Sequence, residues 1–527
     1  MNSLNPLVLL AFALTANQLT PGSFAATSVW DGGGANALWA TAGNWSNNTL
    51  PASGNDVLIG SAYGSGKTIT LSGARYVNSV TFSNASGVTL VASTSLALGG
   101  HILHVATGDF TAKGSGLTTV DCRVNLASPG TFHIGTGRKL EFKRSLQGAP
   151  PPTDPFYFLY AGIHKTGDGE LILGGTNTFG GVLFVEDGKL SVTTSNALPY
   201  TVLYVRGHPY DPTELHFGTG ATPNINYLLL EGETVVTGGS NAKLYVGGIG
   251  LRDQADVDLV LAGSADVLVD DGAEAILRRN NTFTGDITFG YGSVLTVEHD
   301  PGLGSAGNTL HFKENAELVV DDLDGLTASQ RTLLVDTNVQ ALLEIRGELG
   351  CHLAGPGTVV IKIEGGGTIA LDGNNQAFTG RLFSNKHLEV THPDAFGDAD
   401  RIILEAGKDI LFEEHIDAPG TDLETSSGSL ITLNNRNVTL HHLRVGSGND
   451  TTLQLSADAT DRTLHLQDIV FVGASGNLDI EGWLGSAVGS IGDRVEVSGS
   501  LSNSDLQRIR LNGFAVKKLN GELVYAQ

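Results

Sequence analysis

The sequence contains little cysteine: its 527 residues include only Cys122 and Cys351. Small exported folds that depend on disulfides need several closely spaced cysteines, so this class is excluded. Each cysteine lies in a strand-like run, far from the other along the chain. We therefore expect no disulfide between them and interpret both as buried small hydrophobic residues.

Charged residues are also scarce, at 16% of the chain against a usual ~25%. Those present are mostly acidic, because 55 Asp and Glu against 31 Lys and Arg give a formal net charge of −24. Nucleic acids are bound chiefly by Lys and Arg that neutralise phosphates, so nucleic acid is excluded as a partner and anionic lipid is disfavoured. We expect an acidic, well-solvated surface.

Long hydrophobic runs are missing as well. The apolar run at residues 7–14 is too short for a transmembrane helix, which needs roughly 20 apolar residues. With Pro21 and the small-residue site Ser23-Phe24-Ala25 after it, the run is typical of a secretory signal, so we predict a signal peptide over residues 1–25. The alternative is a buried N-terminal strand, since Met1-Asn2-Ser3 carries no Lys or Arg. No later segment is a candidate membrane span.

Glycine, in contrast, is abundant, at 70 of 527 residues. The glycines follow no Gly-x-y period, which excludes collagen, and 41% hydrophobic residues exclude simple disorder. This combination favours many tight turns between short buried strands.

Three blocks of the sequence resemble one another. Each block begins with an aromatic-glycine signature, and a Leu-x-Val strand follows it. A bulky apolar residue stands eight positions after the leucine of that strand. The strands are Leu190-Ser191-Val192, Leu295-Thr296-Val297 and Leu388-Glu389-Val390, the signatures are Asn177-Thr178-Phe179-Gly180-Gly181, Asn281-Thr282-Phe283-Thr284-Gly285 and Gln376-Ala377-Phe378-Thr379-Gly380, and the apolar partners are Leu198, Leu303 and Phe396. Such self-similarity predicts a stacked β-solenoid rather than a closed globule.

Within a block, apolar residues recur two apart, as in Leu171 with Leu173, so each pair can face inward while the residue between them faces water. We predict that the strand before the signature and the two after it make one turn, and that turns stack ~4.8 Å apart in parallel sheets. The glycines after Phe179, Phe283 and Phe378 are expected to supply backbone angles that other residues disfavour.

The third block departs from the pattern. Gln376 replaces the asparagine of the signature, Ser384 takes the place of a bulky apolar residue, and one residue is inserted between Leu371 and Phe378. We predict that this turn is bulged.

The start of the mature chain is rich in tryptophan, with Trp30, Trp39 and Trp45 close together. The first turn of a solenoid has one face without a neighbour, and large rings cover apolar surface well, so we interpret them as a terminal cap. The alternative is a carbohydrate-stacking platform, which needs rings that face solvent and lie coplanar.

The chain divides into a tryptophan-rich cap with the first solenoid turns (26–147), a proline-rich excursion that cannot join a ladder (148–160), the repeat-bearing solenoid (161–472) and a C-terminal cap (473–527). In the last segment, a serine or asparagine N-cap and apolar spacing predict one short helix within 501–509. A hairpin over 514–525 is expected to turn at Leu519-Asn520-Gly521.

At the residues of these blocks the chain resembles the bacterial autotransporter-associated β-strand repeat proteins. The stretch 167–192 follows their repeat pattern nearly throughout, 275–297 in part and 365–390 loosely, and the Trp30-Asp31-Gly32-Gly33 start and the 483–525 ending are also similar to theirs. The resemblance implies a right-handed parallel β-helix, secreted by a bacterium or displayed at its surface, and it brings no catalytic residues. The segment after the repeats is too short for a membrane barrel of ~10-residue strands, so self-secretion is not expected.

Two motifs invite a chemical interpretation and fail on spacing. Gly64-Ser65-Gly66-Lys67-Thr68 looks like a phosphate loop, but the required first glycine would fall at Ser61 and a strand-like run follows, so a turn is expected. Asp321-Asp322-Leu323-Asp324-Gly325 lacks the spacing of an EF-hand, which leaves a loose surface calcium site as the alternative, and Asp270-Asp271-Gly272 is interpreted as a turn.

The histidines do not define a metal site either. His441, His442 and His465 could meet on neighbouring turns, yet His465 stands between two inward-looking leucines and should face solvent, so we interpret these histidines as scattered over the surface. His387 and His392 have no cysteine pair beside them. Carboxylates are too numerous to single out a hydrolytic pair. We therefore expect no catalytic, cofactor-binding or metal-binding residues.

From these inferences we expect an all-β fold, a parallel β-helix with terminal caps. We expect the protein to be exported and non-enzymatic, and to serve as an adhesin-like spacer at the cell surface or in the extracellular matrix. Polysaccharide or matrix components are the expected partners, bound through repeated weak contacts. One alternative is a carbohydrate-active β-helix enzyme, a polysaccharide lyase or glycoside hydrolase, which would need an Asp/Glu/Arg constellation in a cleft on one sheet face. The other is a glycan-binding module that uses the tryptophans.

Overall fold

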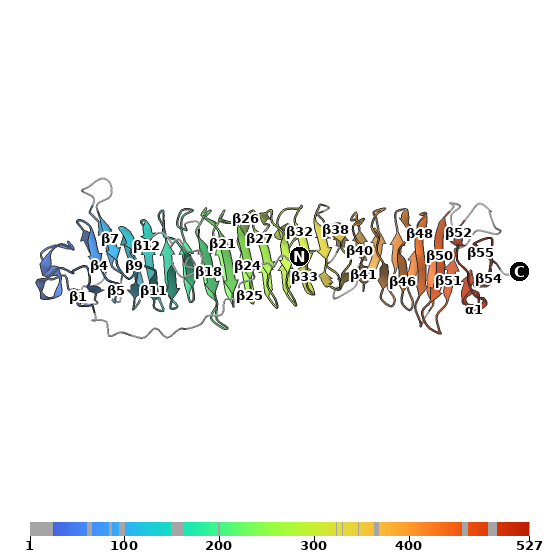
Figure 1. Ribbon diagram of the computed structural model, residues 1–527, viewed down its shortest axis with the longest axis horizontal. Coiled ribbons are helices and arrows are strands. Elements are labelled where there is room, and N and C mark those ends of the chain that lie inside the picture. Colours follow the sequence, from blue (N-terminus) through green and yellow to red (C-terminus); the bar gives the residue numbers. More distant parts are fainter. Residues whose placement is uncertain are drawn as a thin grey trace, which may run out of the picture.

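The protein is a long parallel β-solenoid in which about 17 coils stack along one axis (Figure 1). The computed structural model describes residues 25–60, 66–83, 87–93, 101–148, 162–198, 201–322, 324–328, 330–345, 347–362, 368–448, 450–455, 462–482 and 493–525. The stacking of parallel coils confirms the predicted β-solenoid. The predicted signal peptide before Ala25, residues 149–160 of the proline-rich segment and Trp483 lie outside the described residues.

Each coil runs along up to three walls. Wall A contains, among the described residues, fifteen strands from β1 (Thr27–Trp30) to β38 (His352–Ala354). Wall B extends from β3 (Thr68–Leu71) to β52 (Arg494–Val497). Wall C, which follows a wall B strand along the chain, consists of short strands up to β29 (Thr282–Phe283) and of a longer series from β34 (Gly325–Leu326) to β53 (Ile509–Leu511).

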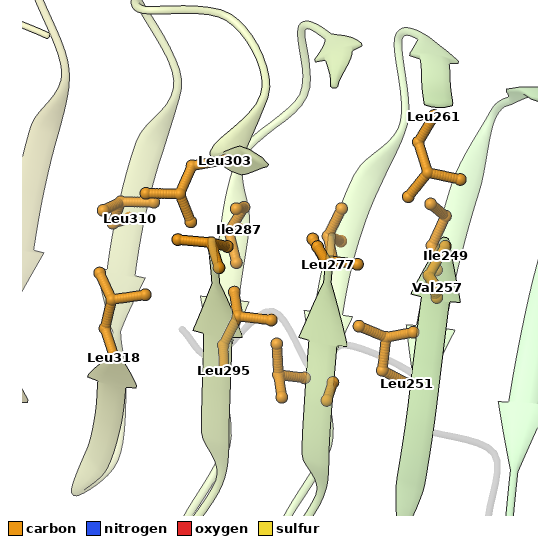
Figure 2. Packing of buried hydrophobic residues seen from close by; sticks show 14 of the residues in the cluster. Ile249, Leu251, Val257, Leu261, Leu277, Ile287, Leu295, Leu303, Leu310 and Leu318 are labelled. Carbon is orange, nitrogen blue, oxygen red and sulfur yellow. The ribbon is translucent and has the colours of Figure 1, made fainter. Parts of the chain in front are cut away.

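The strands form because buried apolar residues alternate with residues that are only partly buried. In β15 (Glu170–Leu173) Leu171 and Leu173 point inward and are fully buried. Leu171 pairs with Leu190 one coil later, and Leu190 with Leu215, so inward side chains stack into ladders. Figure 2 shows such aliphatic side chains filling the interior. The resulting hydrophobic core is one continuous cluster from Trp30 to Leu523.

The predicted composition of one turn was wrong. The strand before the first signature, β15, and the second strand after it, β17 (Lys189–Val192), both lie on wall B and pair directly with each other. Between them the chain forms wall C at the signature itself, where Thr178 bridges to Gln147, and wall A with β16 (Val182–Val185). The aromatic segment is therefore a wall of its own, too short to be recognised as a strand.

The third block is shifted by one wall relative to the other two. Phe378 bridges to Gly355 just beyond β38 of wall A, β41 (Arg381–Ser384) joins wall B, and β42 (His387–Val390) joins wall C. Its strands pair in regular register, and the inserted residue lies in a turn, so the predicted bulge was wrong. Ser384 points inward and its hydroxyl bonds the Lys386 backbone.

The asparagine of each signature is buried and bridges coils. Asn281 accepts a hydrogen bond from the Leu261 amide of the preceding coil at 2.8 Å and donates to the Gly302 carbonyl of the following coil at 2.7 Å. Asn177 makes the same pair of contacts in the first block. In the third block Asn375 makes them. The signature asparagine of the third block is therefore Asn375, and the prediction that Gln376 replaces it was wrong. The residue inserted in this block lies after the asparagine and not before it.

The glycines that follow the aromatic residues serve two different purposes. Gly181 has a φ of +84°, which confirms the expected need for a left-handed conformation. Gly285 and Gly380 instead lie against the backbone of the previous coil, where a Cβ would come within 2.0 Å and 1.9 Å of a carbonyl oxygen. At these two positions glycine is required because a side chain would not fit between the coils. The prediction that they supply backbone angles disfavoured by other residues was therefore wrong for Gly285 and Gly380.

Both ends of the stack are covered. Trp30, Trp39 and Trp45 are at most 1% exposed, and the ring of Trp45 packs edge-on against the other two. This confirms the cap and contradicts the platform, which required exposed coplanar rings. At the other end, Ser502 caps the helix α1 (Asn503–Leu506) in a capping box. The strands β54 (Phe514–Leu519) and β55 (Glu522–Tyr525) form the predicted hairpin.

The two cysteines are free and buried, as expected. Burial raises the pKa of each thiol to about 12, so neither is a nucleophile in the folded protein.

Candidate functional site

The described residues contain one tight group of metal-ligating side chains, and it lies on neighbouring strands of wall B. The strand β48 (Val438–Val445) pairs with β45 (Ile416–Ala418) through its first residues and with β46 (Asp422–Thr425) through its last ones. Along a straight strand successive side chains face opposite sides. At the bend in β48, however, His441 and His442 both lie outside the core.

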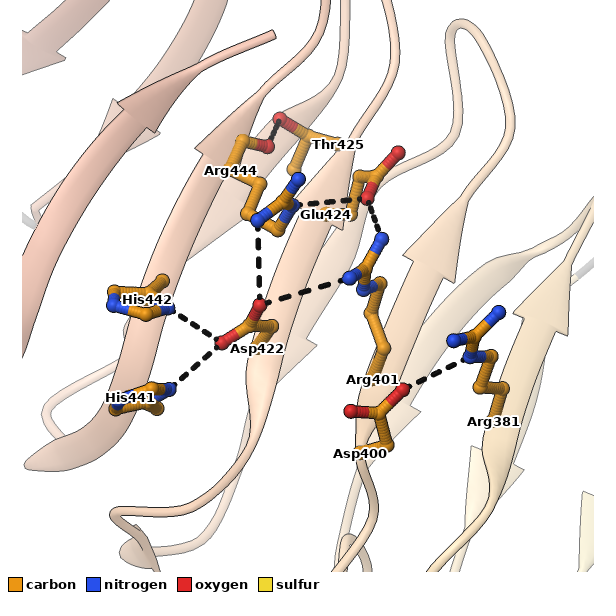
Figure 3. A network of polar contacts seen from close by, with 9 residues as sticks. All are labelled: Arg381, Asp400, Arg401, Asp422, Glu424, Thr425, His441, His442 and Arg444. Atoms are coloured by element: carbon orange, nitrogen blue, oxygen red, sulfur yellow. Dashed lines mark hydrogen bonds and ion pairs between the residues drawn. The ribbon is translucent and has the colours of Figure 1, made fainter.

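Asp422 is the centre of the group (Figure 3). Its Oδ1 lies 3.1 Å from Nδ1 of His441 and 2.9 Å from Nδ1 of His442, and since a carboxylate can only accept, both imidazoles donate to it. Its Oδ2 lies 3.6 Å from Arg444 and 3.9 Å from Arg401. With 11% of its side chain exposed, Asp422 is held by four cationic or polar neighbours.

Glu424 balances the two arginines. It accepts hydrogen bonds from Arg401 at 2.8 Å and from Arg444 at 3.2 Å. The arrangement follows from the stacking of coils, because Arg401 is the register partner of Asp422 and Arg444 that of Glu424. Side chains that are about one coil apart in the sequence are thus brought to hydrogen-bond distance.

The group is accessible from solvent. The side chains of His441 and His442 are 42% and 23% exposed, so a small molecule or an ion can reach them. An imidazole oriented by a carboxylate is suited to general acid–base chemistry or to metal binding. The three donor atoms lie within 4.8 Å of one another.

Two shallow grooves lie farther along the outer surface. One on wall A has a volume of about 630 Å³ and is lined by residues that include Tyr227, Asp266 and Lys313. The Tyr227 ring lies against Gly248, where there is no side chain in its way: a Cβ at Gly248 would lie 2.8 Å from the ring. Burial raises the pKa of Tyr227, which keeps its hydroxyl a neutral donor. The other, about 590 Å³ on wall B, contains Glu274, Ile276 and Thr296.

The histidines considered in the sequence analysis differ in where they lie and in which residues they contact. His441 and His442 meet at Asp422, contrary to the interpretation that they are scattered. His465 pairs with Glu496 at 2.8 Å and is 44% exposed, which confirms that it faces solvent. His387 pairs with Asp409, and His392 accepts a hydrogen bond from the Asp394 amide.

The two motifs rejected on spacing gain no support. Thr68 begins strand β3, as the turn interpretation required, whereas residues 61–65 lie outside the described residues. Asp322 pairs with His299. Asp271 and Gly272 form the predicted turn.

Sequence reasoning missed Asp422, Glu424, Arg401 and Arg444. The signal that could have found them is the coil length: Asp422 and His442 lie 20 positions apart, as do Glu424 and Arg444. A search for complementary charges at that spacing would have identified the group.

Comparisons with known proteins do not identify a relative: no family model, no curated protein and no solved structure matches the chain. In the part of the chain that the structure describes, none of the helices has the length and apolar character needed to cross a membrane.

Proposed function

We propose that the protein is a non-enzymatic, exported β-solenoid that acts as a rigid, adhesin-like spacer at a bacterial cell surface or in the surrounding matrix. The observation that carries this proposal is the core, which continues without a break from Trp30 to Leu523. A stack with both ends capped offers its sides as the surface for binding. The resemblance of the repeats to autotransporter-associated strands supports the same role.

The lateral surface suits extended polymers. The groove with Tyr227 combines an aromatic ring with Asp266 and Lys313, and sugars are recognised by rings together with a few polar groups. The cluster around Asp422 adds arginines and histidines farther along the rod. Several weak contacts along one polysaccharide chain would add up through multivalency.

The test is binding of the full chain to an array of neutral and acidic polysaccharides. We expect retention that becomes weaker when Tyr227→Ala is introduced, while Tyr210→Ala, at a residue that is 97% exposed, has no effect. Failure of every polysaccharide to bind would contradict the adhesive role.

A second candidate, a carbohydrate-active enzyme, is favoured by one specific observation. Asp422 orients two accessible imidazoles beside Arg401 and Arg444, and β-helix enzymes place such groups on one sheet face. Release of reducing ends or unsaturated uronates, lost in Asp422→Asn, would establish this activity. Intact polysaccharide after long incubation would exclude it.

A further inference from the structure

We propose that Asp422, His441 and His442 bind one divalent first-row transition ion, such as Zn²⁺ or Co²⁺. The ligands would be Oδ1 of Asp422 and Nδ1 of each imidazole. This inference stands apart from the proposed function, because it depends on the geometry of three side chains and not on what the rod binds.

The donor atoms already have the spacing of a coordination shell. Both Nδ1 atoms lie about 3 Å from the same oxygen, at 3.1 and 2.9 Å. Ligands held at about 2.0–2.2 Å from an ion are separated by similar distances along the edges of its coordination polyhedron. All three donors lie within 4.8 Å of one another, so an ion can be accommodated by small side-chain rotations.

The fold supplies this geometry at the bend in β48. Adjacent histidines on a straight strand would point to opposite faces, but here the ring centroids lie 3.6 Å apart with the planes tilted by 43°. The inward Leu440 and Leu443 on either side are buried and fix the backbone. The pair is therefore held ready rather than assembled by the ion.

The arginines act as outer partners of the carboxylate. They contact Oδ2, the oxygen that does not face the imidazoles, and their close hydrogen bonds go to Glu424. Such contacts orient a ligating carboxylate. The two guanidinium charges oppose a cation and Glu424 offsets one of them, so we expect moderate rather than very tight affinity.

The donor set also selects the class of ion. Two imidazole nitrogens and one carboxylate oxygen suit Zn²⁺, Co²⁺, Ni²⁺ or Cu²⁺, whereas Ca²⁺ and Mg²⁺ prefer oxygen ligands alone. On binding, each imidazole presents the Nδ1 lone pair to the ion and carries its proton on Nε2. This change moves protons only, and no oxidation state changes. Three protein ligands leave at least one position for water or an external ligand.

The test is titration of the untagged full chain with Co²⁺, followed by visible absorption, and with Zn²⁺ by calorimetry. We expect one equivalent to bind with a ligand-field spectrum. Asp422→Asn and His441→Ala should each weaken binding by at least about tenfold, since removing a ligand costs no less than removing an outer partner. Circular dichroism establishes that each variant is folded, and His441→Ala removes a side chain that is 42% exposed and lies outside the core.

The matched control is His465→Ala, because His465 is as exposed as His441 and also pairs with a carboxylate. Its affinity should equal that of the wild type, and Ca²⁺ in excess should not displace Co²⁺. The proposal is overturned if the wild type binds no ion at about 1 mM, if the Asp422 and His441 variants bind as well as the wild type, or if His465→Ala loses as much.

Discussion

The Asn281 side chain donates a hydrogen bond to the carbonyl of Gly302 in the next coil at 2.7 Å. The same carboxamide accepts from Leu261 in the coil before, so one buried residue joins three coils. Asn281→Ala would leave a buried amide and a buried carbonyl without partners, and we expect a loss of about 3 kcal/mol in the free energy of unfolding. Urea unfolding followed by circular dichroism measures it.

The control for this substitution is the neighbouring Asn280, whose side chain is exposed. Asn280→Ala should change the free energy of unfolding by no more than about 0.5 kcal/mol. Equal losses for the two variants would show that the bridging hydrogen bonds do not stabilise the stack.

A buried ion pair joins the short 3-10 helix η5 (Asp300–Leu303) to the residue that precedes β35 (Thr332–Val335). Arg331 Nε lies 3.0 Å from Asp300 Oδ1, and the two side chains are 1% and 6% exposed. Asp300→Asn would leave a buried guanidinium without its counter-charge and should cost about 3–5 kcal/mol.

The exposed pair Arg381–Asp400, at 2.9 Å with about half of each side chain exposed, provides the comparison. Asp400→Asn should cost less than about 1 kcal/mol. The account of the buried pair fails if both substitutions have the same small effect in thermal and urea unfolding.

Gly285 permits the close stacking of two coils. A Cβ at this position would lie 2.0 Å from the Ala265 carbonyl oxygen, so Gly285→Ala must push the backbones apart. We expect destabilisation of about 1–3 kcal/mol or more. Gly307→Ala, where a Cβ would meet no atom within 4 Å, should be neutral or slightly stabilising. A neutral Gly285→Ala in urea unfolding would contradict the packing described.

Lys165 makes stability depend on pH. Its ammonium group is buried in the core, where it donates to the carbonyls of Gly167 and Asp187, and burial lowers its pKa from 10.5 to about 8. The folded protein therefore holds this proton more weakly than the unfolded chain. Its contribution to the free energy of unfolding should rise by up to about 3 kcal/mol between pH 8 and 10.5 and be lost again as the pH falls through 8.

This gain is measured as the change in unfolding free energy across that pH range. Lys165→Met should lack the gain, whereas Lys139→Met, at a residue with 54% of its side chain exposed, should retain it. A wild-type and a Lys165→Met profile that run parallel would contradict the assignment.

The sequence predicted the strands well because inward residues alternate with polar ones, as Leu295 and Val297 do on either side of Thr296 in β31 (Val294–Val297). It did not predict which wall each strand joins. Wall C at Phe179 is formed by a short bridge with no alternation of its own, and the inserted residue after Asn375 moves the third block by one wall. The wall that a strand joins depends on how many residues the chain uses to complete each coil, and the local pattern of apolar and polar residues does not encode this number.

The site was harder still to predict. His441 and His442 are adjacent residues that alternation would place on opposite faces, and the bend that brings them together depends on the pairing of β48 with both β45 and β46. Asp422 is one of 55 acidic residues, and its role becomes visible when the coil length sets its register with His442.

The most direct test of the central claim, that the rod binds polymers along its sides without cleaving them, is to incubate the full chain with the polysaccharide it binds best. The length of the polymer is then followed by size-exclusion chromatography. The account predicts that the polymer is retained by the protein and keeps its full length. Shortening of the polymer by the wild type, abolished in Asp422→Asn, would contradict it.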